Sequence, residues 1–82
     1  MKQNVDIEKI VKEVLARKDP AGYYVIVAVN STETQKIIEK YSRDGNLFTE
    51  VVGDLIVVRS KARKIVEKLV RALVLKNLLA SI

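Results

Sequence analysis

The chain has 82 residues and contains neither cysteine nor histidine. Disulfides therefore cannot form, and a structural zinc site would lack its nitrogen and sulfur ligands. The commonest general base and the best side-chain nucleophile are also missing. The sequence has only three glycines, and neither the Walker nor the Rossmann phosphate-binding motif occurs in it. We therefore expect a protein that is not an enzyme and that holds no metal or cofactor.

Long apolar runs are absent as well. No stretch of about 18 apolar residues occurs, so the sequence predicts no membrane span. The segment MKQNVDIEKIVKEV lacks the apolar core of a signal peptide. Together with the absence of cysteine, this favours a cytoplasmic location. The abundance of Lys, Glu, Ile and Val, with little Gln, is typical of thermophile proteins, archaeal ones among them.

The small size of the chain predicts self-association. Residues 1–82 make a single domain, and a chain of this length buries only about 60–65 % of its unfolded surface. Small domains compensate with disulfides, a metal or oligomerisation, and only the last is open here. The apolar fraction of 49 % exceeds what one small core needs. We expect a homo-oligomer, with a dimer as the first expectation.

Positive charge is concentrated in one part of the chain, although the net charge is only +5. Residues 1–54 carry eight Lys and Arg against nine Asp and Glu, a net of −1. Residues 55–82 carry seven Lys and Arg against Glu67 alone, a net of +6. This asymmetry indicates an anionic partner, most often nucleic acid.

The first half of the chain predicts a helix, a strand and a second helix. Apolar residues in segment 6–18 follow the helical period, with Asp6 as the N-cap. The run YYVIVAV at 23–29 is typical of a strand covered on both faces. Asn30 or Ser31 would cap the next helix, which Asp44–Gly45–Asn46 would end.

The second half predicts a hairpin and a long helix. LFTEVV and LIVVR flank Gly53–Asp54, a two-residue turn that would pair Phe48 with Arg59. Glu50 would then lie diagonally from Arg59, where an ion pair is a simpler interpretation than a catalytic carboxylate. One face of the hairpin suits packing under helices, and the other is still mostly apolar. Ser60 would cap a final helix over about 61–80.

These elements predict an α+β fold of order α-β-α-β-β-α. The simplest arrangement is a three-stranded antiparallel sheet in which the first two strands flank the third. Right-handed crossovers would place both following helices on one face of the sheet. This is a ferredoxin-like unit without its last strand, with a long C-terminal helix. The other face would need a cover from the N-terminal helix or from a second subunit.

The basic residues of the last strand and helix form the candidate nucleic-acid site. Lys61, Lys64, Lys68 and Arg71 follow spacings of three, four and three, which place them along one helix face. Such a row of cations neutralises phosphates in a sequence-tolerant way, although a solvated helix face is the alternative. The four aromatic residues leave a base-stacking platform open without indicating one. The predicted site comprises Arg59, Lys61, Arg63, Lys64, Lys68 and Arg71.

The distal half of the last helix, VRALVLKNLLASI, is apolar on nearly every side. A helix of this kind is buried on most sides, and one three-stranded sheet cannot cover it. A second subunit is the simplest cover, ahead of another protein. A membrane surface is less suitable, because an interfacial helix keeps a clear polar face. The predicted oligomer interface comprises Leu73, Val74, Leu78 and Leu79.

The order of elements over residues 23–79 resembles the small dimerising subunit of the KEOPS tRNA-modification complex. The segments concerned are YYVIVAV, STETQKIIEKYSRDG, LFTEVVGDLIVVRS and KARKIVEKLVRALVLKNLL. The resemblance implies a dimer that contributes to tRNA binding without a catalytic centre. The helix at 6–18 is extra, and SKARKIVEKLVR only loosely matches the family's Ser/Leu/Arg-rich opening of the long helix. The same layout would serve an archaeal single-stranded DNA- or RNA-binding domain.

Two functions follow from these observations. In the first, the protein is a small non-enzymatic homo-oligomer that binds nucleic acid through its basic helix. In the second, it is an accessory subunit that docks its apolar surface on a larger protein complex, and its charge only keeps it soluble. The sequence does not distinguish DNA from RNA.

Overall fold

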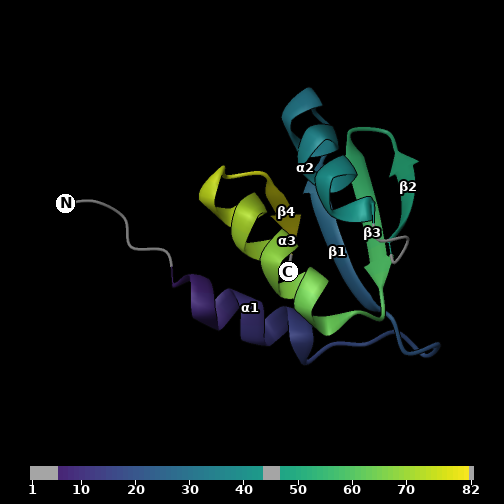
Figure 1. The fold of residues 1–82 in the computed structure, drawn as a ribbon, viewed down its shortest axis with the longest axis vertical. Coiled ribbons are helices and arrows are strands. Elements are labelled where there is room, and N and C mark those ends of the chain that lie inside the picture. Colours follow the sequence, from purple (N-terminus) through teal and green to yellow (C-terminus); the bar gives the residue numbers. More distant parts are fainter. Residues whose placement is uncertain (1–5, 44–46, 82) are drawn as a thin grey trace.

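The computed structural model describes residues 6–43 and 47–81, which form three helices and a four-stranded antiparallel sheet (Figure 1). The strand order is β2-β3-β1-β4. The α+β class is therefore confirmed, but the sheet has one strand more than predicted. From β1 onward the order is β-α-β-β-α-β, so the predicted three-stranded, ferredoxin-like unit is not matched exactly. The elements are α1 (Ile7–Leu15), β1 (Tyr24–Val29), α2 (Thr32–Ser42), β2 (Phe48–Val52), β3 (Leu55–Ser60), α3 (Arg63–Leu75) and β4 (Leu79–Ser81).

The hairpin of β2 and β3 has the predicted register. Phe48 lies opposite Arg59, and Val52 lies opposite Leu55. Gly53 in the turn has a φ of +59°, which only glycine adopts at little cost. On its other side β3 pairs with β1, so β3 is flanked by β1 and β2 as the sequence predicted.

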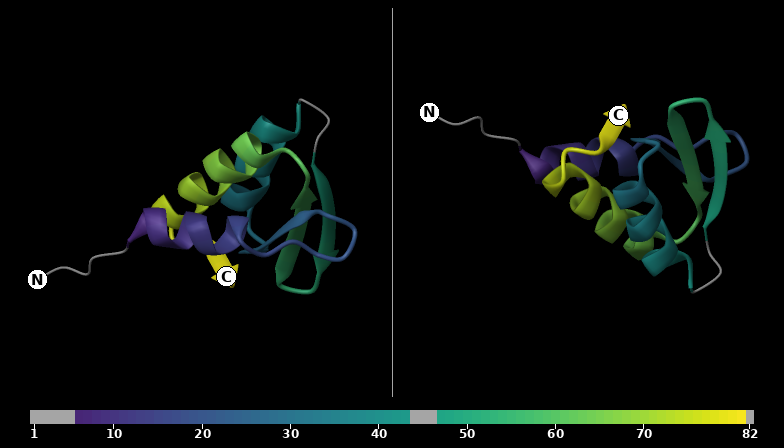
Figure 2. Two further views of the ribbon diagram at one scale, coloured as in Figure 1. Left: turned by 90° about the horizontal axis from the view of Figure 1, so that it is seen from below. Right: turned by 90° about the horizontal axis from the view of Figure 1, so that it is seen from above.

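The hydrophobic core lies between the sheet and the helices. Strands β1 and β3 point alternate side chains into it, because successive residues of a strand face opposite sides. All three helices lie on this side of the sheet, and α1 packs beside α3 (Figure 2). The most deeply buried side chains of the core are those of Ile26, Ala28, Val58, Val66, Leu69, Val70 and Leu73.

Two of the three described helices begin at a residue whose side chain caps the helix. The Asp6 carboxylate accepts a hydrogen bond from the Lys9 amide, as predicted for an N-cap. Ser31 is the N-cap of α2, with its hydroxyl on the Thr34 amide. Ser60 does not cap α3: it ends β3, and the N-cap is Ala62, which has no side-chain bond. The predicted helix end at Gly45 lies outside the described residues.

Helix α3 ends at Leu75, five residues before the predicted end near 80. Asn77 adopts a φ of +59°, and its amide donates to the Val74 carbonyl at 3.0 Å. The Leu78 amide donates to the Leu73 carbonyl at 2.8 Å. This pair of bonds is a Schellman motif with asparagine at C′, and Leu73 and Leu78, at its two ends, are both buried. The motif reverses the chain into β4, which pairs with β1.

The face of the sheet that points away from the helices is open, which we call the open sheet face. No described helix lies over it (Figure 2), so β1 is covered on one face only and not on both as predicted. Segment 16–23 reaches one end of this face, where the ring centroids of Tyr23 and Phe48 lie 5.7 Å apart. The large apolar side chains exposed on this face are Val29, Phe48, Val52 and Leu55.

Candidate nucleic-acid interface

The exposed side of α3 carries the strongest candidates for phosphate contact. The helix buries Val66, Leu69 and Val70 against the sheet, and the helical period then turns Lys64 and Lys68 to the outside. Among the residues that the structure describes, neither lysine forms an ion pair. Both amino groups are therefore available to an anion.

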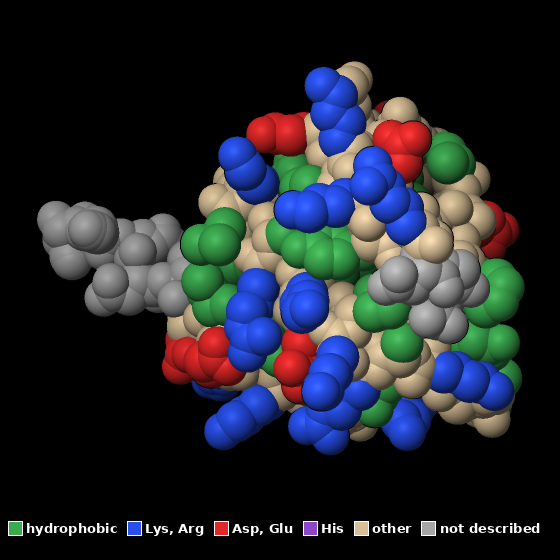
Figure 3. Space-filling model, viewed as in Figure 1, with side chains coloured by type: hydrophobic (Ala, Val, Ile, Leu, Met, Phe, Trp, Pro, Cys, Tyr) green, Lys and Arg blue, Asp and Glu red, His purple; other side chains and the backbone are tan. Residues whose placement is uncertain are grey.

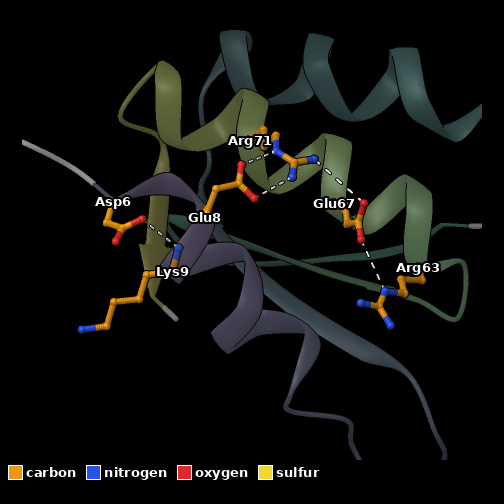
Figure 4. Close-up of polar contacts among 6 residues, drawn as sticks. All are labelled: Asp6, Glu8, Lys9, Arg63, Glu67 and Arg71. Carbon is orange, nitrogen blue, oxygen red and sulfur yellow. Dashed lines mark hydrogen bonds and ion pairs between the residues drawn. The ribbon is translucent and has the colours of Figure 1, made fainter.

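The two arginines of α3 are held by carboxylates (Figure 4). The Arg71 guanidinium donates two hydrogen bonds to Glu8 of α1, with Nη2–Oε1 at 2.9 Å and Nε–Oε2 at 3.2 Å. Glu67 lies between Arg71 and Arg63, with Arg63 Nε–Glu67 Oε2 at 3.3 Å. The hydrogen bonds from Arg71 lower the pKa of Glu8, and Glu8 raises the pKa of Arg71. Much of the positive charge of these arginines is thus compensated within the chain.

Arg59 and Lys61 are not part of the α3 row. Arg59 lies on the open sheet face, where its guanidinium is 3.6 Å from Glu50 and 3.8 Å from Asp19. The predicted Glu50–Arg59 ion pair is therefore present. The Lys61 amino group lies 4.8 Å from the centroid of the Tyr23 ring at the end of the sheet. The structure thus separates the six predicted cations into an exposed lysine pair, two compensated arginines and a group at the end of the sheet.

Sequence reasoning missed the lysines that α2 adds to the same layer. Lys36 and Lys40 are exposed on α2, which packs beside α3. Lys76, just beyond α3, reaches back to Glu33 of α2, with Nζ–Oε2 at 3.7 Å. Lys and Arg side chains surround an apolar patch on the helical face (Figure 3). The i, i+4 spacing of Lys36 and Lys40, with the predicted placement of both helices on one face, could have indicated this.

The four residues of the predicted oligomer interface on the distal half of α3 are covered largely by the chain itself. Leu73 is completely buried within the chain, and Leu78 is 9 % exposed. Val74 and Leu79 are half-buried against the same core. Helices α1 and α2 and the additional strand β4 provide cover that the sequence analysis assigned to a second subunit. Four exposed large apolar side chains lie on the open sheet face, and two others, Val51 and Leu75, lie on the helical side.

No protein-family model, curated protein or solved structure matches this chain. Within residues 6–43 and 47–81, no helix has the length and apolar character needed to span a membrane. In the same part of the chain, no three metal-ligating side chains of His, Cys, Asp or Glu gather. The assignment of function therefore depends on the surfaces described above.

Proposed function

We propose that the protein is a small non-enzymatic nucleic-acid-binding protein that acts as a homo-oligomer in the cytoplasm. The observation that carries this proposal is the exposed pair Lys64 and Lys68, which lie one helical turn apart and have no carboxylate partner among the described residues. The neighbouring Arg63 and Arg71 form ion pairs with Glu67 and Glu8, respectively. Lys64 and Lys68 are therefore the cations of α3 that are available to an external anion.

Two mobile ammonium groups on a helix suit a phosphate backbone better than a specific base. Lysine acts as a point charge with a flexible stem, so it follows a phosphate without fixing its orientation. Lys36 and Lys40 of α2 extend the positive surface beside α3. Binding of this kind is electrostatic and tolerates different sequences, and it weakens as salt displaces the protein from the phosphates.

Fluorescence anisotropy with labelled DNA and RNA at low and high salt tests this function. The double variant Lys64→Glu, Lys68→Glu should abolish most binding. Replacing both lysines by alanine should lower the slope of log K against log salt by about 1.4 for a single strand, since each contact contributes about 0.7. The single variant Lys68→Glu should weaken binding. Its control is Lys9→Glu, which makes the same charge change at an amino group that points away from α3 (Figure 4). No affinity at low salt, or full affinity in the double variant, would refute the function.

The open sheet face is the surface that we propose for self-association. Val52 is 52 % exposed and Phe48 is 58 % exposed. With Val29 and Leu55 they form an exposed apolar patch on one face of the sheet, and the largest apolar patch of a small protein is often functional. A two-fold contact would cover this face in both copies at once.

Light scattering at micromolar concentration measures this association directly. We expect the mass of a dimer for the unmodified chain and the mass of a monomer for Val52→Glu. Leu75→Glu, an exposed substitution on the helical side, is the matched control and should keep the dimer mass. A monomer for the unmodified chain would contradict the proposed self-association while leaving nucleic-acid binding to be judged by anisotropy.

The same open face favours a second candidate function, that of an accessory subunit docked on a larger protein complex. In this case the chain would be monomeric alone and would bind no oligonucleotide at low salt. The two measurements above therefore separate the candidates. The resemblance to the KEOPS subunit stays a prediction, because no match tests it.

A further inference from the structure

A groove lies between α2 and α3, on the same side of the molecule as Lys64 and Lys68. Its volume is about 270 Å³, and it is lined by Ile37, Lys40, Tyr41, Ala72, Leu75 and Lys76. Leu75 is 72 % exposed, the largest value among the big apolar side chains described. The lining combines apolar side chains, an aromatic ring and two lysines, which could receive a small apolar group with negative charge beside it.

Two lysines, Lys40 and Lys76, lie on the rim of this groove. The Lys40 amino group lies 5.7 Å from the centroid of the Tyr41 ring and has no carboxylate partner among the described residues, whereas Lys76 is paired with Glu33 of α2. Lys68 precedes Ala72 by one turn, about 6 Å along the helix axis. Figure 3 shows an apolar patch on this face with Lys and Arg side chains around it. A complementary ligand would place an apolar group in the groove and a negative charge near Lys40 and Lys68.

We propose that this groove holds an unpaired base of a single-stranded nucleic acid. The inference rests on the proposed function, because Lys64, Lys68 and Lys40 would contact the phosphates on either side of that base. A nucleobase has a π-face that can lie against Tyr41 and Leu75, and such stacking tolerates any base. In a duplex the bases are stacked inside the helix, so only a single strand offers this contact. Contacts to phosphates alone would not distinguish a single strand from a duplex. A base in the groove would add a preference for single strands.

Anisotropy with three labelled probes of one length tests the base contact. The probes are a single-stranded oligonucleotide, the same strand with several abasic positions, and the corresponding duplex. Base stacking against a protein side chain strengthens binding by roughly tenfold per base. We expect the unmodified protein to bind the intact strand roughly tenfold more tightly than the abasic strand, with the same number of phosphates in both.

Leu75→Ala should remove most of this difference, because it takes away one wall of the groove without adding charge. Val51→Ala is the matched control: Val51 is also an exposed apolar side chain, 63 % exposed, but it lies on β2. The control should discriminate between intact and abasic strands as the unmodified protein does. Both substitutions are on the surface, so both variants should fold.

The outcomes distinguish failure of the inference from failure of the proposed function. Equal affinity for intact and abasic strands, with binding still weakened by Lys68→Glu, would overturn the base site and leave phosphate binding in place. No binding of any probe would refute the proposed function and the inference together. If an acidic amphipathic peptide binds, and Leu75→Ala weakens only that peptide, the groove belongs to a protein partner and the base site is wrong.

Discussion

Asn77 provides a sharp test of the fold, because its φ of +59° is required for the turn from α3 into β4. A left-handed conformation costs an ordinary L-residue about 1–2 kcal/mol, and a β-branched residue pays at least the upper part of this range. Asn77→Val should therefore destabilise the protein by about 2 kcal/mol. In a domain of this size that corresponds to a fall in Tm of roughly 8–16 °C. Asn77→Gly should be neutral or stabilising, because glycine is the preferred residue at C′.

The two substitutions distinguish this turn from the continuous helix over 61–80 that the sequence pattern predicts. In a helix interior, glycine would be the worse substitution, at about 0.5–1 kcal/mol relative to a good helix former, and valine would be well tolerated. Urea denaturation followed by circular dichroism measures both free energies of unfolding. If the glycine variant is less stable than the valine variant, residue 77 is helical, and both the Schellman motif and β4 are wrong.

Three further predictions concern the core, a helix cap and an ion pair. Leu69→Ala should lower the free energy of unfolding by about 2–5 kcal/mol in urea denaturation, because Leu69 is completely buried; a smaller loss would show that the core is looser than described. Ser31→Ala should lower the free energy of unfolding by about 1–2 kcal/mol in the same assay, because it removes the N-cap of α2 and the hydrogen-bond partner of the buried Thr34 hydroxyl. Ser42→Ala, at the other end of α2, is the control. Because Arg71 lowers the pKa of Glu8 from 4.5, the pair stabilises the fold above that pH, and this stabilisation is lost as the pH falls through the lower folded-state value. Glu8→Gln should thus lower the Tm at pH 7 and have no effect near pH 2, and an equal loss at both pH values would contradict an electrostatic role.

The elements and the hairpin register could be predicted because the signals for them are local. The two-residue turn at Gly53–Asp54 fixes which residues of β2 and β3 face each other, and alternation assigns their faces. Strand β4 could not be found by periodicity, because its three residues continue the apolar composition of the helix before them. The available signal was Asn77, since asparagine is the second choice after glycine at a helix end.

The candidate site was predictable in part, for a different reason. Spacing placed Lys64 and Lys68 on the outside of α3, because the helical period depends only on the sequence. The Glu8–Arg71 pair joins residues 63 positions apart, and no local pattern indicates which cation a distant carboxylate will neutralise. Arg59 was grouped with the helix because it is close in sequence, but the strand directs its side chain to the opposite side of the sheet.

Strand β4 also has a consequence for the dynamics of the sheet. Ala28 of β1 pairs with Leu79, so this contact closes a loop of about 50 residues, whereas the β2–β3 hairpin closes locally. We expect β4 to dock late during folding and to detach first in partial unfolding, since it is short and has one neighbour. When β4 detaches, β1 becomes an edge strand, as β2 already is at the other side of the sheet. The unpaired backbone groups of β1 then lie next to its apolar side chains. We therefore expect the three residues of β4 to protect the β1 edge from pairing with a strand of another copy.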